Sequence, residues 1–218
     1  MRGPMKFYGY FRSSAAYRCR IAFNLKGVTP DFVPVHLRKG EQRGADFLSR
    51  NPHGLVPALE TDDGHLLTQS LAIIEWLDEM KPTPAVLPRD PIDRAHVRAL
   101  ALSIACEIHP LQNLRVLSYL RADLKQDQAG VDQWCRTWIE SGLAALDTQI
   151  AASGKSGQFC FGDTPTLADI CLAPQVFSAA RFGADIAKLT NIKRVMASCD
   201  AQPAFTAAHP AQQPDFEA

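Results

Sequence analysis

A cluster of prolines divides this 218-residue chain into two parts of different character. Four of the 15 prolines lie between Pro82 and Pro91, in the run Pro-Thr-Pro-Ala-Val-Leu-Pro-Arg-Asp-Pro. Such a run is stiff and extended, because proline fixes one backbone angle and removes a hydrogen-bond donor. We therefore predict a domain boundary there, with one domain over residues 1–85 and a second over residues 92–218.

Strand-like and helix-like runs alternate in the first part. The predicted elements are a strand from Met5 to Tyr10, a helix from Ser14 to Lys26 that Gly27 ends, a strand from Asp31 to Leu37, a strand from Gly54 to Glu60, a turn at Asp62-Asp-Gly64, a strand from His65 to Thr68, and a helix that Ser70 caps. The polar segment between residues 38 and 51 predicts a loop with a short helical turn. Pro34 favours an edge position for the second strand. The order βαβ followed by ββα predicts a small mixed sheet flanked by helices, with a right-handed crossover between its parallel strands.

Beyond the prolines, apolar residues recur at helical spacing and no run predicts a strand with any strength. The predicted helices run from Asp93 to about Ala122, from Gly130 to about Ala152, and from Thr166 to about Phe182 with Pro174 inside, followed by one or two shorter helices and a tail rich in Pro, Gln and Ala. Pro110 should either kink the first of these helices or start a new segment of it. Thr166 and Asp169 have the spacing of a capping box, in which the acidic side chain reaches back to the cap. The chain is thus predicted to combine an α/β domain with an all-α domain.

The composition is that of an ordinary globular protein and argues against several classes. The formal net charge is zero and neither part is strongly basic, so we expect neither nucleic acid nor a membrane as a partner. No apolar run approaches the roughly 18 residues of a membrane span, and the first residues lack the apolar core of a secretory signal. The six cysteines form no C-x-x-C pair and do not lie near histidines at zinc-ligand spacing. We therefore expect no metal site, and small buried thiols in a reduced, cytoplasmic protein.

The segment from Tyr10 to Ala22 contains the most informative polar residues of the chain. A strand that turns directly into a helix aims the first helical N–H groups at the turn, where they favour an anion or a thiolate. Here the turn contains two hydroxyls, Ser13 and Ser14, with Arg12 before them and Arg18 after them. Taken alone, a serine at this position is usually a helix cap. The alternative is that the turn activates a thiol that the protein does not itself supply.

Several motifs resemble those of one enzyme family over nearly the whole chain. They are Phe11-Arg-Ser-Ser-Ala-Ala-Tyr-Arg-Cys-Arg-Ile-Ala, Asn51-Pro, Val56-Pro57-Ala-Leu, Gln69-Ser70-Leu-Ala-Ile-Ile-Glu-Trp-Leu, His109-Pro-Leu-Gln-Asn113 and Gly162-Asp-Thr-Pro-Thr-Leu-Ala-Asp169. With these motifs the chain resembles the zeta class of the glutathione transferases, which includes the maleylacetoacetate and maleylpyruvate isomerases. The resemblance implies a thioredoxin-like N-terminal domain, an all-helical C-terminal domain, and a homodimer that binds glutathione.

The resemblance gives the serine turn a specific role, and the turn also departs from the family in one residue. Ser13 would be the hydroxyl that activates the thiol of glutathione, with Ser14 close by. The commonest zeta signature has a cysteine two residues after the first serine, whereas this chain has Ala15. The protein supplies no thiol at that position, so any catalytic sulfur must come from glutathione.

Other residues would bind the rest of glutathione if the resemblance holds. Val56 would precede a cis-proline, Pro57, and pair its backbone with the cysteinyl part like a neighbouring strand. Gln69 and Ser70 would hold the γ-glutamyl carboxylate at a helix N-terminus, and Gln42 would also reach glutathione. The residues alone allow a trans bond before the proline, a simple helix cap and an exposed glutamine instead.

Five polar residues are candidates for contact with the substrate. His109, Gln112 and Asn113 have the spacing i, i+3, i+4, so they would share one face of the predicted helix. By the resemblance they would line a cleft beside glutathione, whereas a lone histidine is more often structural. Arg12 and Arg181 are candidate carboxylate clamps, because a guanidinium matches a carboxylate with two hydrogen bonds. An ordinary salt bridge is the alternative for each arginine.

These residues lead to one predicted activity and two alternatives. The prediction is a glutathione-dependent cis–trans isomerase of a small unsaturated dicarboxylate, maleylpyruvate or maleylacetoacetate, in the catabolism of aromatic compounds. The thiolate would add to the cis double bond, the resulting single bond would rotate, and elimination would give the trans product. The catalytic residues would be Ser13, Ser14, Arg12, Arg181 and His109. The alternatives are a transferase or dehalogenase that consumes glutathione, and a non-catalytic module that only binds it.

Overall fold

The computed structural model describes residues 4–217, and the chain forms two compact units. The first unit contains residues 1–85 together with residues 203–218, and the second contains residues 86–202. This division differs from the predicted domains in the last residues, which were expected in the helical domain and belong to the first unit.

The first unit is built on a four-stranded mixed sheet with the strand order β2-β1-β3-β4. Its elements are β1 (Lys6–Gly9), α1 (Ser14–Lys26), β2 (Asp31–Pro34), η1 (Leu37–Lys39), η2 (Glu41–Arg43), α2 (Ala45–Leu48), β3 (Ala58–Glu60), β4 (Leu66–Thr68) and α3 (Ser70–Met80), with α9 (Pro203–Ala208) and η5 (Pro210–Gln212) later in the chain. β1 pairs in parallel with β2 and antiparallel with β3, and β3 pairs antiparallel with β4. The predicted order βαβ-ββα is confirmed, and β2, which contains Pro34, lies at an edge of the sheet.

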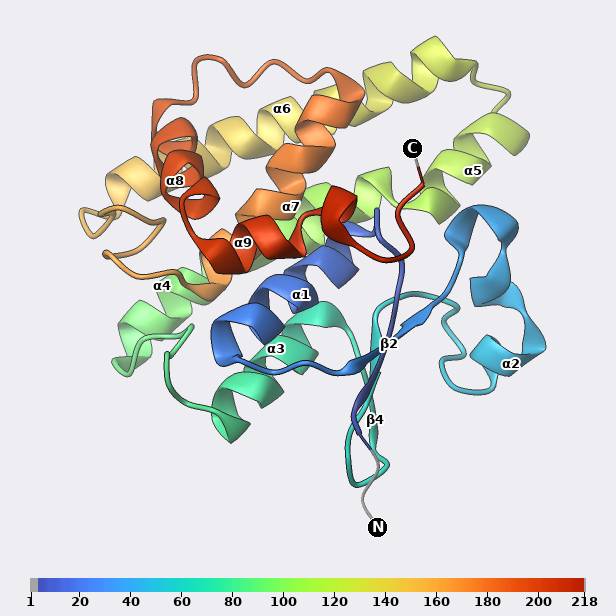
Figure 1. Ribbon diagram of the computed structural model, residues 1–218. Helices are drawn as coiled ribbons and strands as arrows, with labels where there is room; N and C mark the ends of the chain where they lie inside the picture. The colour runs from blue at the N-terminus through green and yellow to red at the C-terminus, as the bar shows by residue number, and fades with distance from the viewer. Residues whose placement is uncertain (1–3, 218) are drawn as a thin grey trace. The chain divides into compact units, whose positions relative to one another are not determined.

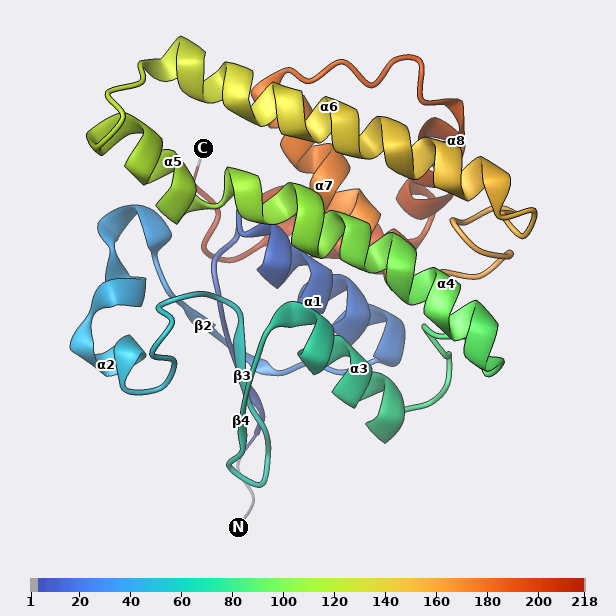
Figure 2. The same cartoon turned by 180° about the vertical axis from the view of Figure 1, so that it is seen from behind.

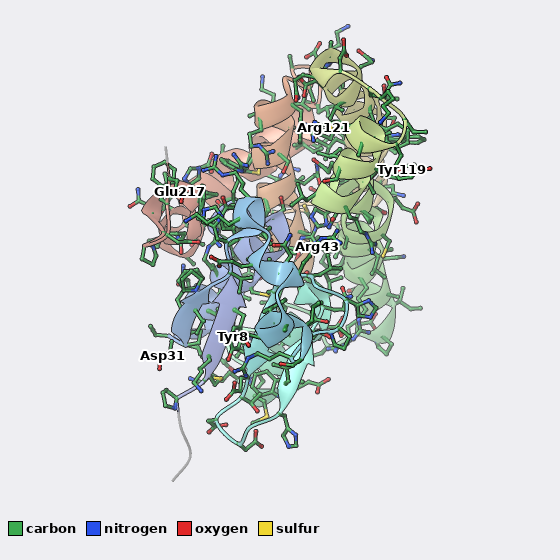
Figure 3. The ribbon with its side chains drawn as sticks, turned by 90° about the vertical axis from the view of Figure 1, so that its right-hand side faces the viewer. Tyr8, Asp31, Arg43, Tyr119, Arg121 and Glu217 are labelled. Atoms are coloured by element: carbon green, nitrogen blue, oxygen red, sulfur yellow. The ribbon has the colours of Figure 1, made fainter. Side chains whose placement is uncertain are left out.

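The sheet separates two apolar layers, with α1 and α3 on one side and the segment of α2 on the other (Figures 1 and 2). Neighbouring residues of a strand point to opposite faces. Phe7 packs on the first side against Phe23 of α1, with ring centroids 5.0 Å apart. Tyr8, labelled in Figure 3, packs on the other side against Phe47 of α2, with ring centroids 6.3 Å apart. The sheet is therefore buried on both faces.

α1 begins and ends at the predicted residues. Ser13 is its N-cap, and Gly27 follows it with a φ of 60°, a left-handed conformation that glycine adopts without steric strain. The end of α1 is tied to α3 by a buried ion pair between Lys26 and Asp78. The helix that presents the serine turn is thus anchored at its far end.

The residues from 203 onward join the first unit because α1 holds them. Arg20 Nε donates to the carbonyl oxygen of Ala208 at 3.0 Å, and Asn24 Nδ2 donates to that of Ala204 at 2.9 Å. The partners lie 188 and 180 residues apart in the sequence. Helical periodicity carries no information on such distant pairs. The sequence therefore placed residues 203–218 in the helical domain, whereas these hydrogen bonds join them to the first unit.

The second unit is helical, which confirms the predicted class. Its elements are α4 (Pro91–Leu102), the π-helical turn η3 (Ser103–Ile108), the 3₁₀ turn η4 (His109–Gln112), α5 (Leu114–Ala122), α6 (Gln128–Ala152), α7 (Leu167–Phe182) and α8 (Thr190–Asp200). α7 packs against α4, α6 and α8, and most of its side chains are buried. None of the helices described in residues 4–217 is long and apolar enough to cross a membrane.

The helical stretch predicted from Asp93 to Ala122 is divided around Pro110, as the alternative of a new segment predicted. α4 passes into η3 and η4, and α5 begins only after Asn113. Pro110 lies in η4, where its missing N–H prevents the α-helical ladder from continuing. Asn113 is extended, with φ −68° and ψ 145°, and its Oδ1 accepts the N–H of Arg115 at 3.2 Å as the cap of α5.

α7 begins with the predicted capping box, and the predicted proline lies inside it. One carboxylate oxygen of Asp169 accepts the backbone N–H of Thr166 at 2.8 Å and the hydroxyl of the same residue at 2.7 Å. The cysteines are free, and those other than the exposed Cys106 are buried, as the sequence predicted for most of them.

Candidate functional site

Ser13 lies in the turn between β1 and α1 and serves as the helix cap. Its Oγ accepts the backbone N–H of Ala16 at 3.2 Å, and its own N–H donates to the carbonyl oxygen of Tyr10 at 3.0 Å. A hydroxyl has two acceptor lone pairs and one O–H donor, so this cap leaves the donor without an acceptor among residues 4–217. The two interpretations of Ser13, cap and thiol activator, are therefore compatible.

The charges around Ser13 favour an anion. The first turn of α1 contains no acidic residue. Arg12 is half-buried, with its guanidinium carbon 6.0 Å from the ring centroid of Phe11. Arg12 makes no hydrogen bond or ion pair with residues 4–217, so the salt-bridge alternative does not apply to it. Ser14 is the first residue of α1 and is buried.

Val56 and Pro57 are joined by a cis peptide bond, as the family resemblance predicted. The side chain of Val56 is buried in one apolar cluster with Tyr10 and Phe11, at the start of the serine turn. Within the described part of the chain, the backbone of Val56 has no hydrogen-bond partner. An extended peptide could therefore pair with this residue as a strand does.

The N-terminus of α3 has an unusual backbone. Gln69 has φ 68° and ψ 118°, a backbone conformation that residues other than glycine rarely adopt. Its side chain makes no cap hydrogen bond. The predicted cap, Ser70, is instead the first residue of the helix, so this part of the prediction was wrong. Ser70 Oγ accepts a hydrogen bond from Arg18 Nη1 at 3.4 Å.

Arg18 adds a buried positive charge beside this helix N-terminus. Its exposed fraction is 2%, and its Nε and Nη2 have no partner within residues 4–217. A buried guanidinium is strongly disfavoured unless an anion compensates it. The sequence placed Arg18 near the serines, but its contact with Ser70, 52 residues later, could not be predicted from local spacing.

Gln42 is buried rather than exposed. Its exposed fraction is 7%, and its Oε1 is buried without a hydrogen-bond partner in the described chain. The sequence left an exposed glutamine open as an alternative, and the structure excludes it. A buried amide oxygen without a donor is costly, which suits a position that a ligand completes.

The three polar candidates of the second unit do not lie on one α-helical face. His109 and Gln112 are three residues apart in the 3₁₀ turn η4, where such residues share a face. Asn113 is the extended cap that follows the turn, so the predicted i, i+3, i+4 face was wrong for this residue. Both amide atoms of Gln112 are buried without a partner in residues 4–217. Trp134 Nε1 fixes this turn by donating to the carbonyl oxygen of Leu111 at 2.7 Å.

Arg181 lies in the last turn of α7 and is exposed. Its guanidinium carbon lies 4.7 Å from the ring centroid of Phe182. Burial raises the pKa of Cys135 to about 11, and the positive charges of Arg181, Arg121 and Arg136 oppose that shift. Arg181, Arg121 and Arg136 therefore act electrostatically on one thiol of the second unit, and Asp132 acts in the opposite sense.

The predicted site residues are divided between the two units. The first unit contains Arg12, Ser13, Ser14, Gln42, Val56, Pro57, Gln69 and Ser70, and the second contains His109, Gln112, Asn113 and Arg181. The described residues contain no group of His, Cys, Asp and Glu side chains that could hold a metal ion.

Comparison with known proteins gives the family. Residues 12–80 match the family model described as glutathione S-transferase, N-terminal domain, and residues 116–201 match that of the C-terminal domain. A maleylpyruvate isomerase of Ralstonia sp. is 49% identical over 211 residues, which cover 97% of this chain and 99% of the relative. The holo structure of a bacterial maleylpyruvate isomerase, a zeta-class glutathione S-transferase, has a TM-score of 0.95 and 48% identity, over 97% of this chain and 100% of that chain.

The chain belongs to the zeta class of the glutathione transferases. A maleylacetoacetate isomerase of the same fold, from Anaeromyxobacter dehalogenans, has a TM-score of 0.88 and 43% identity, over 99% of this chain and 98% of that chain. That structure has dicarboxyethyl glutathione and citrate bound in its active site.

This zeta-class protein has no thiol of its own in the serine turn. Ala15, where the commonest family signature has a cysteine, lies in the first turn of α1. Cys19 is in the same helix, but it is buried and its Sγ lies 3.8 Å from the carbonyl oxygen of Ser70. The turn from Tyr10 to Ala15 thus contains no cysteine, and the cysteine of the helix that follows is buried.

Proposed function

We propose that this protein is a glutathione-dependent cis–trans isomerase of a small unsaturated dicarboxylate, maleylpyruvate or maleylacetoacetate, in aromatic catabolism. The observation that carries the proposal is the Ser13 hydroxyl, which keeps its O–H donor at the N-terminus of α1. Ala15 leaves the same turn without a thiol, so the sulfur must come from a bound molecule. The names of the similar proteins support the same reaction.

The first unit contains candidate groups for the γ-glutamyl and cysteinyl parts of glutathione. Gln69 and Ser70 would bind the γ-glutamyl carboxylate at the N-terminus of α3, and the buried charge of Arg18 would favour that anion. Val56 would pair its backbone with the cysteinyl residue. The buried Oε1 of Gln42 would accept a donor from the ligand. These orphaned polar atoms fit a bound peptide with charged ends.

Ser13 would convert the bound thiol into a nucleophile. Bound glutathione supplies a thiolate that adds to the cis double bond and leaves again after the bond has rotated. A free thiol has a pKa near 8.5 and is mostly protonated at neutral pH. The O–H of Ser13 and the N–H groups of α1 would stabilise the charged form and lower that pKa. Arg12 would add to this effect through its positive charge.

Two arginines are the proposed anchors of the substrate carboxylates. Arg12 and Arg181 each hold a guanidinium beside a phenylalanine ring, which restricts its orientation. Arg121 and Arg136 would strengthen the positive potential around Arg181. His109 and Asn113 are proposed as further polar contacts, with Gln112 as a donor or acceptor that the ligand would satisfy. Fixing both ends of the dianion would orient its double bond toward the thiolate.

The assembly and location are part of the proposal. The resemblance that predicts the activity also predicts a homodimer, and free cysteines fit a reducing compartment such as the cytoplasm. Light scattering of the purified protein, read against the mass of 23.9 kDa for one chain, tests the homodimer.

The experiment is a turnover assay with maleylpyruvate and with maleylacetoacetate, each with and without glutathione. We expect conversion to the trans isomer only with glutathione, and no loss of glutathione during the reaction. Consumption of glutathione would favour a transferase or dehalogenase instead. Binding of glutathione without turnover of either substrate would favour a non-catalytic module and contradict the proposal.

The anchors are tested in the same assay. Arg12→Ala and Arg181→Ala should each lower kcat/KM for the dicarboxylate about tenfold or more, because a charged hydrogen-bonding partner is lost. Glutathione affinity should remain within about twofold of the wild type, since neither residue is proposed to bind it. Arg89→Ala, an exposed arginine of the proline-rich segment, is the matched control. Full activity in both anchor variants would exclude the two clamps.

A further inference from the structure

A tail segment of the first unit, Gln213–Glu217, contacts the turn that carries the proposed catalytic groups. Asp215 Oδ2 accepts the backbone N–H of Phe11 at 2.8 Å, although the two residues lie 204 positions apart in the sequence. The ring of Phe216 meets that of Phe11 edge-on, with centroids 5.4 Å apart and an interplanar angle of 83°. The tail is the red segment of Figure 1, and Figure 3 labels Glu217 at its outer end.

Arg20 binds the carbonyl oxygens of the same turn. Its Nη2 donates to the carbonyl oxygen of Phe11 at 2.9 Å, and its Nη1 donates to that of Tyr10 at 3.4 Å. Burial lowers the pKa of Arg20 to about 10, and the Asp215 carboxylate is the largest charge that opposes the shift. Phe11 is therefore bound at its N–H by Asp215 and at its C=O by Arg20.

The two hydrogen bonds of the Phe11 backbone determine where the neighbouring side chains lie. The ring of Phe11 carries the guanidinium of Arg12 at 6.0 Å. Ser13 donates its N–H to the carbonyl oxygen of Tyr10, which Arg20 also binds. A rotation of the Phe11 peptide would thus displace both the proposed carboxylate anchor and the Ser13 hydroxyl that is proposed to activate the thiol.

The tail is itself attached to the first unit at both ends of the segment. Gln213 Nε2 donates to the carbonyl oxygens of Ala207 and His209, at 3.0 Å each. Glu217 lies 2.8 Å from His36 Nε2 and also pairs with Arg38. The contacts of Gln213 and Glu217, on either side of Asp215, therefore fix its position beside the turn.

We propose that Asp215 is a positioning residue for catalysis, which holds Arg12 and Ser13 in the geometry that the reaction requires. It touches neither glutathione nor the dicarboxylate and acts through the Phe11 peptide. The inference rests on the proposed function, because it assigns no new chemistry and adds a residue to the same site. It also assigns Phe216 the role of supporting the ring on which Arg12 lies.

Asp215→Ala tests the role, with Asp215→Asn and Glu217→Gln as matched variants. Asp215→Ala should lower kcat about 10- to 100-fold, because a small displacement of catalytic groups has a cost of that order. It should raise the pKa of the bound glutathione thiol by about half a unit or more, as Ser13 moves away from the sulfur. The KM for glutathione should stay within about twofold, because its other contacts lie outside the turn.

The conservative variants separate positioning from folding. Asp215→Asn keeps a carbonyl oxygen for the Phe11 N–H and should retain kcat within about threefold of the wild type. Glu217→Gln keeps a side-chain oxygen that accepts hydrogen bonds from His36 and Arg38, so the tail stays attached and neither kcat nor the thiol pKa should change. If Asp215→Ala does not fold, Phe216→Leu is measured instead and should lower kcat without changing the KM for glutathione. A wild-type kcat and thiol pKa in the alanine variant, or an equal loss in Glu217→Gln, would overturn the role.

The thiol titration also tests the positioning role of Asp215 independently of the isomerase activity. It needs glutathione alone and no dicarboxylate. If the wild type binds glutathione but does not isomerise either substrate, the proposed function fails, and the effect of Asp215→Ala on the thiol pKa still decides whether the tail positions the turn.

Discussion

Two helices of this protein, α1 and α7, begin with a hydroxyl-bearing cap, and the two caps differ in what they leave unused. At α7, Asp169 is fully buried and takes the N–H and the hydroxyl of Thr166, while its other oxygen accepts the N–H of Cys160 at 2.7 Å. At α1, Ser13 accepts a single N–H and keeps its own O–H, and the first turn has no acidic residue. The cap of α7 is saturated and the cap of α1 is not.

A structural cap and a ligand-binding cap differ in the hydrogen-bonding groups that remain free. A Ser or Thr before a helix predicts a cap in both places, and the sequence pattern looks equally good. What distinguishes them is the hydrogen-bond capacity that remains after the cap has formed. A carboxylate inside the first turn closes the α7 terminus, whereas the α1 terminus keeps both a donor and a positive end for an anion.

The largest effect is expected from Ser13→Ala. Removal of the donor should lower kcat about 100- to 1,000-fold, as the loss of a group that stabilises a developing charge usually does. The free energy of unfolding should fall by only about 1 kcal/mol, the usual value of a lost cap. Turnover assays and urea unfolding measure the two quantities. Ser13→Thr, which keeps the hydroxyl, is the control and should retain more activity than Ser13→Ala. A loss of activity below tenfold would place the thiol activation elsewhere.

The opposite pattern is expected at α7. Asp169→Ala leaves three buried donors without an acceptor and should lower the free energy of unfolding by about 3 kcal/mol or more. The kcat of the folded protein should stay close to that of the wild type at a temperature where it remains folded. Asp163, an exposed carboxylate that accepts the N–H of Gln158 at 2.9 Å, gives the control. Asp163→Ala should lose about 1 kcal/mol or less. Equal effects of the two substitutions on stability would show that the buried cap is not special.

The N-terminus of α3 is a third case, in which the residue before the helix is Gln69. Gln69 before α3 has a positive φ that favours glycine, so Gln69→Gly should leave the free energy of unfolding unchanged or raise it by up to about 1 kcal/mol. It should nevertheless weaken glutathione binding about tenfold, because a side-chain donor to the carboxylate is lost. Calorimetric titration and thermal unfolding check the two outcomes together. Lower stability with unchanged affinity would mean that Gln69 is a structural residue.

The smallest effect concerns pH and the tail. The hydrogen bond from His36, together with that from Arg38, lowers the pKa of Glu217 below its ordinary value of 4.5. A carboxylate with a lowered pKa in the folded state contributes stability above its unfolded pKa and loses it as the pH falls through the folded value. We therefore expect the amides of residues 213–217 to lose protection against exchange, relative to their intrinsic rates at each pH, below about pH 4.5 in the wild type. Glu217→Gln should remove this pH dependence, and an unchanged profile would contradict the contact.

The sequence predicted the parts of the site that depend on local signals. The bounds of α1, its end at Gly27 and the capping box of α7 follow from residues within a few positions of one another. The cis bond before Pro57 came only from the family resemblance. The roles of Ser13 and the other site residues remain predictions until the substitutions are made.

The parts that the sequence could not predict depend on contacts between distant residues. The hydrogen bond from Phe11 to Asp215 spans 204 positions, and that from Arg18 to Ser70 spans 52. The burial of Gln42 and the membership of the tail in the first unit follow from the same kind of contact.

The central claim is that the unused donor of Ser13 activates a sulfur that glutathione supplies. The direct test is a titration of the bound glutathione thiol, followed by the ultraviolet absorbance of the thiolate, in the wild type and in Ser13→Ala. The account predicts a pKa about one unit or more below the free-thiol value of about 8.5 in the wild type, and a return toward that value in the variant. An equal thiol pKa in the two proteins would contradict it.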